Sequence, residues 1–195
     1  MMEVVVLDYG AGNVRSVVFA LERLGISARL SNDPQVISNA DYIIFPGQGE
    51  AAMAMNKLNL FGLTAVLPNL KQPILGICLG MQLLFENTEE GNTRGLGILK
   101  GSVKKFESGK IPQMGWNSLQ NLRGSLFDSI NENTHMYLVH SYYAPVVPET
   151  LATTTYGTTY SVAIQKDNFY GVQFHPEKSS QAGQQLLQNF LQIKQ

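Results

Sequence analysis

The sequence is poor in the features that indicate a disulfide framework, a nucleic-acid surface or a membrane span. It holds 1 cysteine, so we expect no internal disulfide and a reducing compartment, the cytoplasm. The formal net charge is −1 and the longest basic run is Lys104-Lys105, which argues against nucleic acid or an anionic membrane as a partner. The apolar run before Asp8 is too short to predict a signal peptide or a membrane span.

What remains is the composition of an ordinary compact protein, with 44% hydrophobic and 15% charged residues in a chain of 195. We expect a single domain over residues 1–195. In the first half, short β-branched runs alternate with segments of helical periodicity. This alternation predicts an α/β fold, in which a mostly parallel twisted central sheet carries helices on both faces. The expected strands are 3–7, 26–30, 41–45 and 73–77, and the expected helices are 14–24, 50–57 and 60–70.

After Glu86 the pattern changes. Residues 87–97 are polar and contain glycine, which predicts a loop. Short strands then dominate, and they predict a largely antiparallel C-terminal extension of the sheet. A final amphipathic helix is expected over 179–192. The strands expected in this half are 98–106, 136–140, 151–156, 160–165 and 169–174.

The single cysteine lies in the most informative segment, residues 73–84. This segment predicts a buried strand, a sharp turn with Cys78 at its apex, and an amphipathic helix. Gly76 and Gly80 flank the cysteine in a G-x-C-x-G pattern, which is typical of turns that expose a nucleophile between strand and helix. A thiolate at the start of a helix is also stabilised by the helix dipole. A buried structural cysteine is the alternative interpretation.

Two glycine-containing turns follow other expected strands. Residues 47–49, which we call the oxyanion loop, come after the strand ending at Phe45, and their backbone N–H groups can stabilise an oxyanion; a plain connecting turn is the alternative. The carboxyl ends of parallel strands share one edge, so this loop and Cys78 are expected to face one crevice. The turn at 10–12 precedes Asn13, the expected N-cap of a helix, and favours a turn or partner contact over a phosphate site.

Two further residues complete a catalytic pattern. His175 and Glu177 are two apart at the end of an expected strand, so both side chains are expected on one face, with the carboxylate orienting the imidazole. Cys78, His175 and Glu177 then supply a nucleophile, a base and an orienting group for acyl transfer. The other histidines, His135 and His140, have a spacing that suits no zinc motif, and we interpret them as structural. No metal and no cofactor is expected.

At this point the motifs resemble a known family. Residues 76–82 (GICLGMQ) together with 174–177 (FHPE) are similar to the class I, triad-type glutamine amidotransferases. Three more stretches, 8–16, 112–117 and 175–180, resemble the glutaminase subunits of imidazole glycerol phosphate synthases. The similarity runs from end to end and implies a flavodoxin-like glutamine amidotransferase fold. Two residues depart from the family pattern: Gln113 replaces the usual histidine and Gln48 a frequent valine.

The resemblance implies glutamine as the substrate and a thioester on Cys78 as the intermediate, with His175 and Glu177 completing a triad. It implies that an oxyanion is stabilised by backbone N–H groups of Leu79 and of Gln48 or Gly49. It also implies substrate contacts from Gln82, one helical turn beyond the cysteine, and from Gly49, Ser141 and Tyr142.

The resemblance further implies a partner, since free ammonia would be protonated in water. That partner is a (β/α)₈-barrel cyclase subunit, joined as a heterodimer, that makes imidazole glycerol phosphate and aminoimidazole carboxamide ribonucleotide in histidine biosynthesis. Three alternatives stay open: a paralogous glutaminase that supplies amino-sugar or surface-polysaccharide synthesis, a non-catalytic interaction subunit, and a redox sensor or cysteine peptidase on the same sheet. The residues expected at the partner interface are Tyr9, Asn13, Arg15, Trp116 and Lys178.

Overall fold

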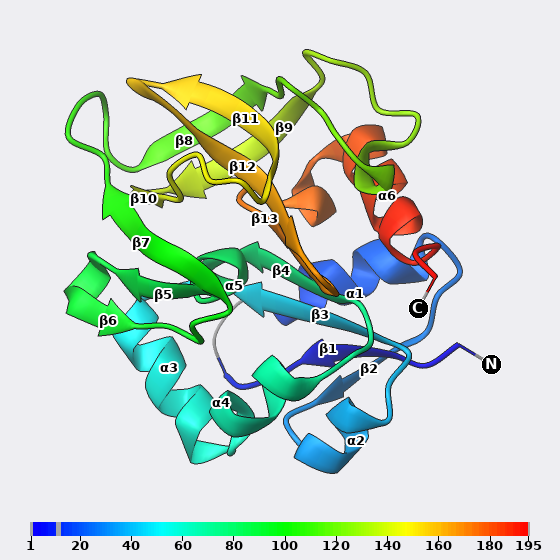
Figure 1. Cartoon of the computed structure of the whole chain (residues 1–195). Coiled ribbons are helices and arrows are strands. Elements are labelled where there is room, and N and C mark those ends of the chain that lie inside the picture. Colours follow the sequence, from blue (N-terminus) through cyan, green and yellow to red (C-terminus); the bar gives the residue numbers. More distant parts are fainter. Residues whose placement is uncertain (1, 11–12, 195) are drawn as a thin grey trace.

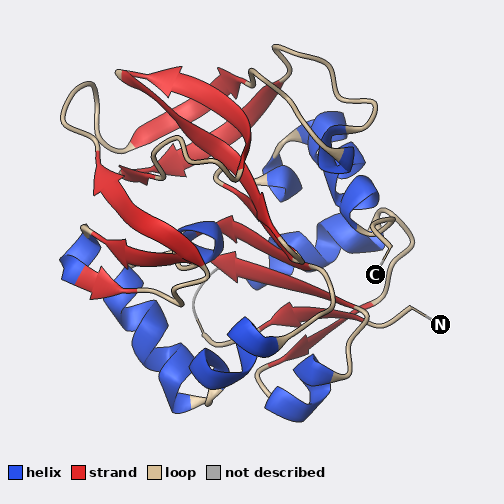
Figure 2. Cartoon of the chain, viewed as in Figure 1, coloured by secondary structure: helices blue, strands red, loops and turns tan. Residues whose placement is uncertain are grey.

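The structure is a computed structural model that describes residues 2–10 and 13–194, and its centre is a seven-stranded sheet (Figures 1 and 2). Residues 11 and 12 of the glycine-containing turn lie outside the described part. The strand order in the sheet is β11-β12-β13-β4-β3-β1-β2. The bounds are β1 Val4–Leu7, β2 Ala28–Ser31, β3 Tyr42–Gly47, β4 Ile74–Cys78, β11 Thr150–Tyr156, β12 Thr158–Lys166 and β13 Phe169–Val172.

The direction of the strands confirms the predicted fold class. The five strands β2, β1, β3, β4 and β13 are parallel, whereas β12 and β11 extend the sheet as antiparallel strands. The central strands β1 and β4 are buried along their whole length, as expected for parallel strands covered on both faces. The carboxyl ends of β3 and β4 therefore lie side by side at one edge.

Helices cover both faces of the sheet, as the sequence predicted. Helices α1 (Val14–Glu22) and α6 (Ser180–Phe190) bury Leu21, Leu187 and Phe190 in a core on one face (Figure 1). The other core receives Ile37, Leu58 and Leu63 from the helices of the opposite face. Those helices are α2 Pro34–Ser38, α3 Ala51–Leu60 and α4 Leu63–Val66, which is followed by a 3₁₀ turn at Leu67–Asn69.

The second half differs from the prediction in its sheets. Besides the antiparallel extension by β11 and β12, it adds two separate sheets, a four-stranded one ordered β10-β7-β5-β6 and a β8-β9 hairpin. The segment 87–97, expected as a loop, contributes to two of these strands and a 3₁₀ turn at Glu90–Asn92. The bounds are β5 Phe85–Thr88, β6 Thr93–Arg94, β7 Leu99–Lys105, β8 Gln113–Ser118, β9 His135–His140 and β10 Tyr142–Tyr143.

Two helices also differ from expectation. Helix α2 was not predicted, although Asp33 caps it through a 2.8 Å bond to the backbone N–H of Gln35 and Pro34 begins it. Helix α5, Leu79–Gln82, was expected to be amphipathic but is only 4 residues long and buried on every side. Within the part of the chain that the structure describes, no helix is long and apolar enough to cross a membrane.

Candidate active site

Cys78 ends β4 in a strained turn. Its φ of 55° and ψ of −108° lie in a region that residues with a side chain rarely adopt, so the surrounding structure must hold the turn. Gly80 allows the close approach, because a Cβ atom there would lie 1.9 Å from the carbonyl oxygen of Phe45. The sequence prediction of a sharp glycine-flanked turn at Cys78 is therefore confirmed.

His175 and Glu177 come together by a different local geometry from the one expected. β13 ends at Val172, and Pro176–Lys178 forms a 3₁₀ turn, so the segment is not extended. The turn folds Glu177 back until its Oε1 lies 2.8 Å from Nδ1 of His175, with both side chains 2% exposed. The carboxylate accepts from Nδ1–H, so Nε2 is the atom left to act elsewhere.

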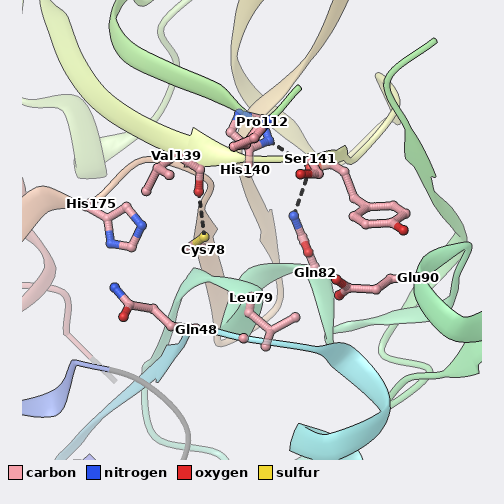
Figure 3. A pocket seen from close by; sticks show the side chains of 12 residues that line it. Gln48, Cys78, Leu79, Gln82, Glu90, Pro112, Val139, His140, Ser141 and His175 are labelled. Atoms are coloured by element: carbon pink, nitrogen blue, oxygen red, sulfur yellow. Dashed lines mark hydrogen bonds between the residues drawn. The ribbon is translucent and has the colours of Figure 1, made fainter. Parts of the chain in front are cut away.

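That remaining nitrogen lies beside the cysteine. Nε2 of His175 is buried and has no hydrogen-bond partner of standard geometry among the described residues, and Figure 3 shows the ring next to the Cys78 sulfur. Burial lowers the pKa of His175, but the interactions with Cys78 and Glu177 outweigh it and raise the pKa well above its usual value. A thiolate and a carboxylate on either side thus favour the imidazolium.

Cys78 opens into a cavity of about 360 Å³, enough for a small amino acid (Figure 3). The cavity is lined by all the residues for which oxyanion or substrate contacts were expected: Gln48, Gly49, Leu79, Gln82, Ser141 and Tyr142. Gly49 has a φ of 95°, which suits glycine at this turn. His175 lines the same cavity, so the structure brings the predicted residues of β3, β4 and the β13 end together.

Gln82 is held rigidly rather than solvated. Its side chain is buried, and Nε2 donates 2.9 Å bonds to the backbone oxygen of Tyr142 and to Oε1 of Gln173. Both N–H groups are therefore used inside the protein. The side-chain oxygen is the atom left to accept from a ligand in the cavity.

Glu90 also lines the cavity, and sequence reasoning missed it. Its Oε2 accepts a 3.0 Å bond from the backbone N–H of Ala51, the first residue of α3. Burial, and to a smaller extent Glu50, raise the pKa of Glu90, although the Ala51 bond opposes this. The residue lies in a segment that was expected to be a plain loop, and no local pattern marks it.

His140 and Gln113 form the wall behind the cavity. Nδ1 of His140 lies 2.7 Å from the Tyr142 oxygen, and its Nε2 lies 3.1 Å from the Tyr160 hydroxyl. Oε1 of Gln113 lies 2.8 Å from the same hydroxyl. Gln113, one of the two departures from the family pattern, is 2% exposed and belongs to this buried network. His135 is exposed.

The five expected interface residues fall into different environments. Tyr9 is a correction: its ring is 1% exposed and packs on Phe45, and its hydroxyl donates to the Pro46 oxygen at 2.9 Å, so its side chain is part of the core. Asn13 caps α1 through its bond to the Ser16 N–H, as predicted. Arg15 is exposed.

Trp116 and Lys178 meet at one exposed cluster. Trp116 is 49% exposed and packs edge-on against Tyr137, with 6.0 Å between ring centroids. Lys178 lies over the ring of Tyr137, its Nζ 5.9 Å from the centroid. We call Trp116, Tyr137 and Lys178 the aromatic cluster; its Lys178 ends the 3₁₀ turn that carries Glu177. Among the described residues, no group of His, Cys, Asp and Glu is arranged to hold a metal ion.

Comparisons with known proteins agree with this geometry. The chain is 47% identical over 196 residues to "Imidazole glycerol phosphate synthase subunit HisH" of Bacteroides fragilis, covering 98% of this chain and 100% of the relative. It is 45% identical to the protein of that name from Yersinia pseudotuberculosis, with the same coverage. The solved structure of PurLQS from Thermotoga maritima superposes with a TM-score of 0.74 at 18% identity, covering 97% of this chain and 97% of that one. The sequence model of the family described as "Glutamine amidotransferase class-I" matches residues 5–193, and the chain therefore belongs to that family.

Proposed function

We propose that this protein is the glutaminase subunit of an imidazole glycerol phosphate synthase and acts in histidine biosynthesis. The observation that supports this most directly is the meeting of Cys78 and His175 at one cavity, with Glu177 bonded to His175, in a chain 47% identical to a relative of that name. The cavity volume of about 360 Å³ suits glutamine.

The chemistry follows from the atoms present. The Cys78 thiolate attacks the side-chain amide carbon of glutamine, forming a C–S bond and a tetrahedral oxyanion. His175, as imidazolium, donates its Nε2 proton to the departing nitrogen, so ammonia leaves and a thioester remains. Neutral His175 then takes a proton from a water molecule while the oxygen of that water attacks the thioester carbon. The C–S bond breaks, glutamate leaves, and the thiolate–imidazolium pair is restored.

The walls of the cavity supply the remaining contacts. The backbone N–H groups of Leu79 and of Gln48 or Gly49 stabilise the oxyanion, an effect of about 3–4 kcal/mol per donor. The side-chain oxygen of Gln82 accepts from the substrate, and the backbone of Ser141 and Tyr142 lies alongside. Glu90 is the carboxylate of the cavity, and it pairs with the α-ammonium group of glutamine.

The ammonia passes to a (β/α)₈-barrel cyclase subunit with which the protein forms a heterodimer. The aromatic cluster supports this assignment, since tryptophan and tyrosine are among the residues enriched in interaction hot spots. Asn13 and Arg15 belong to the same proposed interface. The reaction needs a reduced thiol, which favours a cytoplasmic location, and the family match over residues 5–193 favours a single domain.

The test is glutamine hydrolysis by the purified protein with and without the cyclase subunit of the same organism and its ribonucleotide substrate. We expect glutamate release that requires Cys78, is lost in Cys78→Ala, and rises when the cyclase is added. Formation of imidazole glycerol phosphate from glutamine identifies the acceptor. Hydrolysis without any response to the cyclase would instead favour a different acceptor, and absence of hydrolysis in the complex would exclude a glutaminase.

A further inference from the structure

Gln173 is a buried amide to which the proposed mechanism gives no role. It lies two residues before His175, and its side chain is 0% exposed. Its amide contacts two groups of the site at once. Nε2 lies 3.6 Å from the sulfur of Cys78, and Oε1 accepts a 2.9 Å bond from Nε2 of Gln82.

The orientation of this amide is fixed by a backbone carbonyl. The oxygen of Tyr142 can only accept, so the group of Gln82 that lies 2.9 Å from it must be the NH₂. The second hydrogen of that NH₂ then points to Gln173 and requires the oxygen of Gln173 to face it. Nε2 of Gln173 is left facing the sulfur. His140 lies 2.7 Å from the same carbonyl oxygen through Nδ1 and holds it from the other side.

The sulfur therefore has two neighbours that favour opposite protonation states of Cys78. The carbonyl oxygen of Val139 lies 3.9 Å from Sγ and can accept from a thiol S–H, so it favours the protonated form. The N–H of Gln173 donates and favours the anion, because a hydrogen bond to a charged acceptor is stronger than one to a neutral acceptor. Because Gln173 is 0% exposed, its amide N–H lies against the sulfur without competition from bulk water.

We propose that Gln173 is a further catalytic residue, whose amide is oriented by Gln82 and donates to the Cys78 sulfur to stabilise the thiolate. The role in glutamine hydrolysis rests on the proposed function, whereas the thiolate itself can be measured without any substrate. The assignment also links substrate binding to the nucleophile, because Gln82 contacts both the substrate and Gln173.

Other ionisable groups surround the sulfur and must be separated from this effect. His175 lies beside it, with Glu177 behind the ring. Tyr9, on the opposite side of the sheet, interacts with Cys78 electrostatically. His140 and Glu90 line the same cavity as Cys78. All five stay unchanged in the Gln173 and Gln82 variants, so a difference between these variants and the wild type reports the amides.

The experiment is the rate of alkylation by iodoacetamide as a function of pH. The sequence holds 1 cysteine, so the reaction reports Cys78 alone in the full chain. We expect Gln173→Met to move the midpoint of the profile upward by about one pH unit, the size expected for loss of one hydrogen bond to a charged group. Gln82→Met should move it in the same direction by less, because Gln173 stays in place but loses its orientation.

Gln72→Met is the matched control. Gln72 is also a buried glutamine, 8% exposed, and its amide donates to the Ile37 oxygen at 3.0 Å, away from the cavity. We expect its midpoint to equal that of the wild type. A folded Gln173→Met protein with an unshifted midpoint would overturn the proposal. If that variant does not fold, an unshifted Gln82→Met midpoint does the same. A shifted midpoint in a protein that never hydrolyses glutamine would reject the proposed function but leave the thiolate contact standing.

Discussion

Gly47 and Cys78 are register partners on the neighbouring parallel strands β3 and β4. The oxyanion loop and the nucleophile therefore leave the sheet side by side. The fit is close, because a Cβ atom on Gly47 would lie 2.7 Å from the backbone nitrogen of Gly80. The turn at Cys78 thus packs backbone against backbone, and this contact sets the geometry on which the site depends.

The first prediction concerns this contact. Gly80→Ala should lower the free energy of unfolding by about 3 kcal/mol or more, since the new Cβ would meet the backbone oxygen of Phe45 at 1.9 Å. Gly25→Ala is the control, because Gly25 has a φ of 76° but no atom within 4 Å of the added Cβ. It should lower the free energy by only about 1 kcal/mol. Urea unfolding measures both, and equal effects would argue against a backbone clash.

The second prediction is a loss of stability in acid caused by His140. Burial lowers the pKa of His140 to about 4, although the Tyr142 bond opposes this. Between pH 6.5 and about 4 the unfolded chain thus binds a proton that the folded protein does not. Stability contributed by this residue is present above pH 6.5 and is lost as the pH falls, with a slope of up to about 1.4 kcal/mol per pH unit.

Unfolding by denaturant at several pH values measures this slope. His140→Asn should flatten the dependence in that window, even though its stability at neutral pH is lower. The exposed His135 offers a control, and His135→Asn should keep the wild-type slope. Equal slopes in all three proteins would show that His140 does not titrate as its burial requires.

The third prediction concerns recognition of glutamine. Glu90→Gln should raise the KM for glutamine by about 10- to 100-fold and change kcat by less. The reason is that a charge-assisted contact to the substrate is lost equally in the bound ground state and in the transition state. Glu89→Gln is the neighbouring control. The Glu89 carboxylate accepts from the Lys105 N–H at 2.8 Å and does not line the cavity. Steady-state glutaminase kinetics of the complex measure the KM of both variants. An unchanged KM in Glu90→Gln would show that the α-ammonium group of glutamine does not bind at Glu90.

The fourth prediction concerns the aromatic cluster. Trp116→Ala should weaken binding of the cyclase subunit by about 30-fold or more, because an exposed tryptophan is expected to be a hot spot. Leu60→Ala removes a large apolar side chain that is 79% exposed, and it should leave affinity unchanged. Titration calorimetry with the cyclase measures both variants. Equal affinities for wild type and Trp116→Ala would move the interface to another face.

Sequence periodicity was sufficient for the parallel half of the fold. The strands that lead to Leu7, Gly47 and Cys78 are apolar runs bounded by glycine, and such runs are buried whatever their neighbours are. The short helix α2 was missed because five residues give little periodicity; its signal was the Asp33-Pro34 cap. The β8-β9 hairpin was missed as a separate sheet because a strand pattern predicts an element but not its partner.

By itself, the sequence determined the nucleophile turn and the closeness of His175 to Glu177, although it did not predict the 3₁₀ turn that joins them. Both features depend on residues close together in the chain. Only the tertiary structure decided that Tyr9 is core, that Gln113 supports the cavity wall, and that Glu90 and Gln173 face the site. The physical reason is that burial and hydrogen-bond partners come from contacts between distant segments, such as the 2.9 Å bond between Gln82 and Gln173 across 91 residues. The spacing of residues along the chain does not predict such contacts.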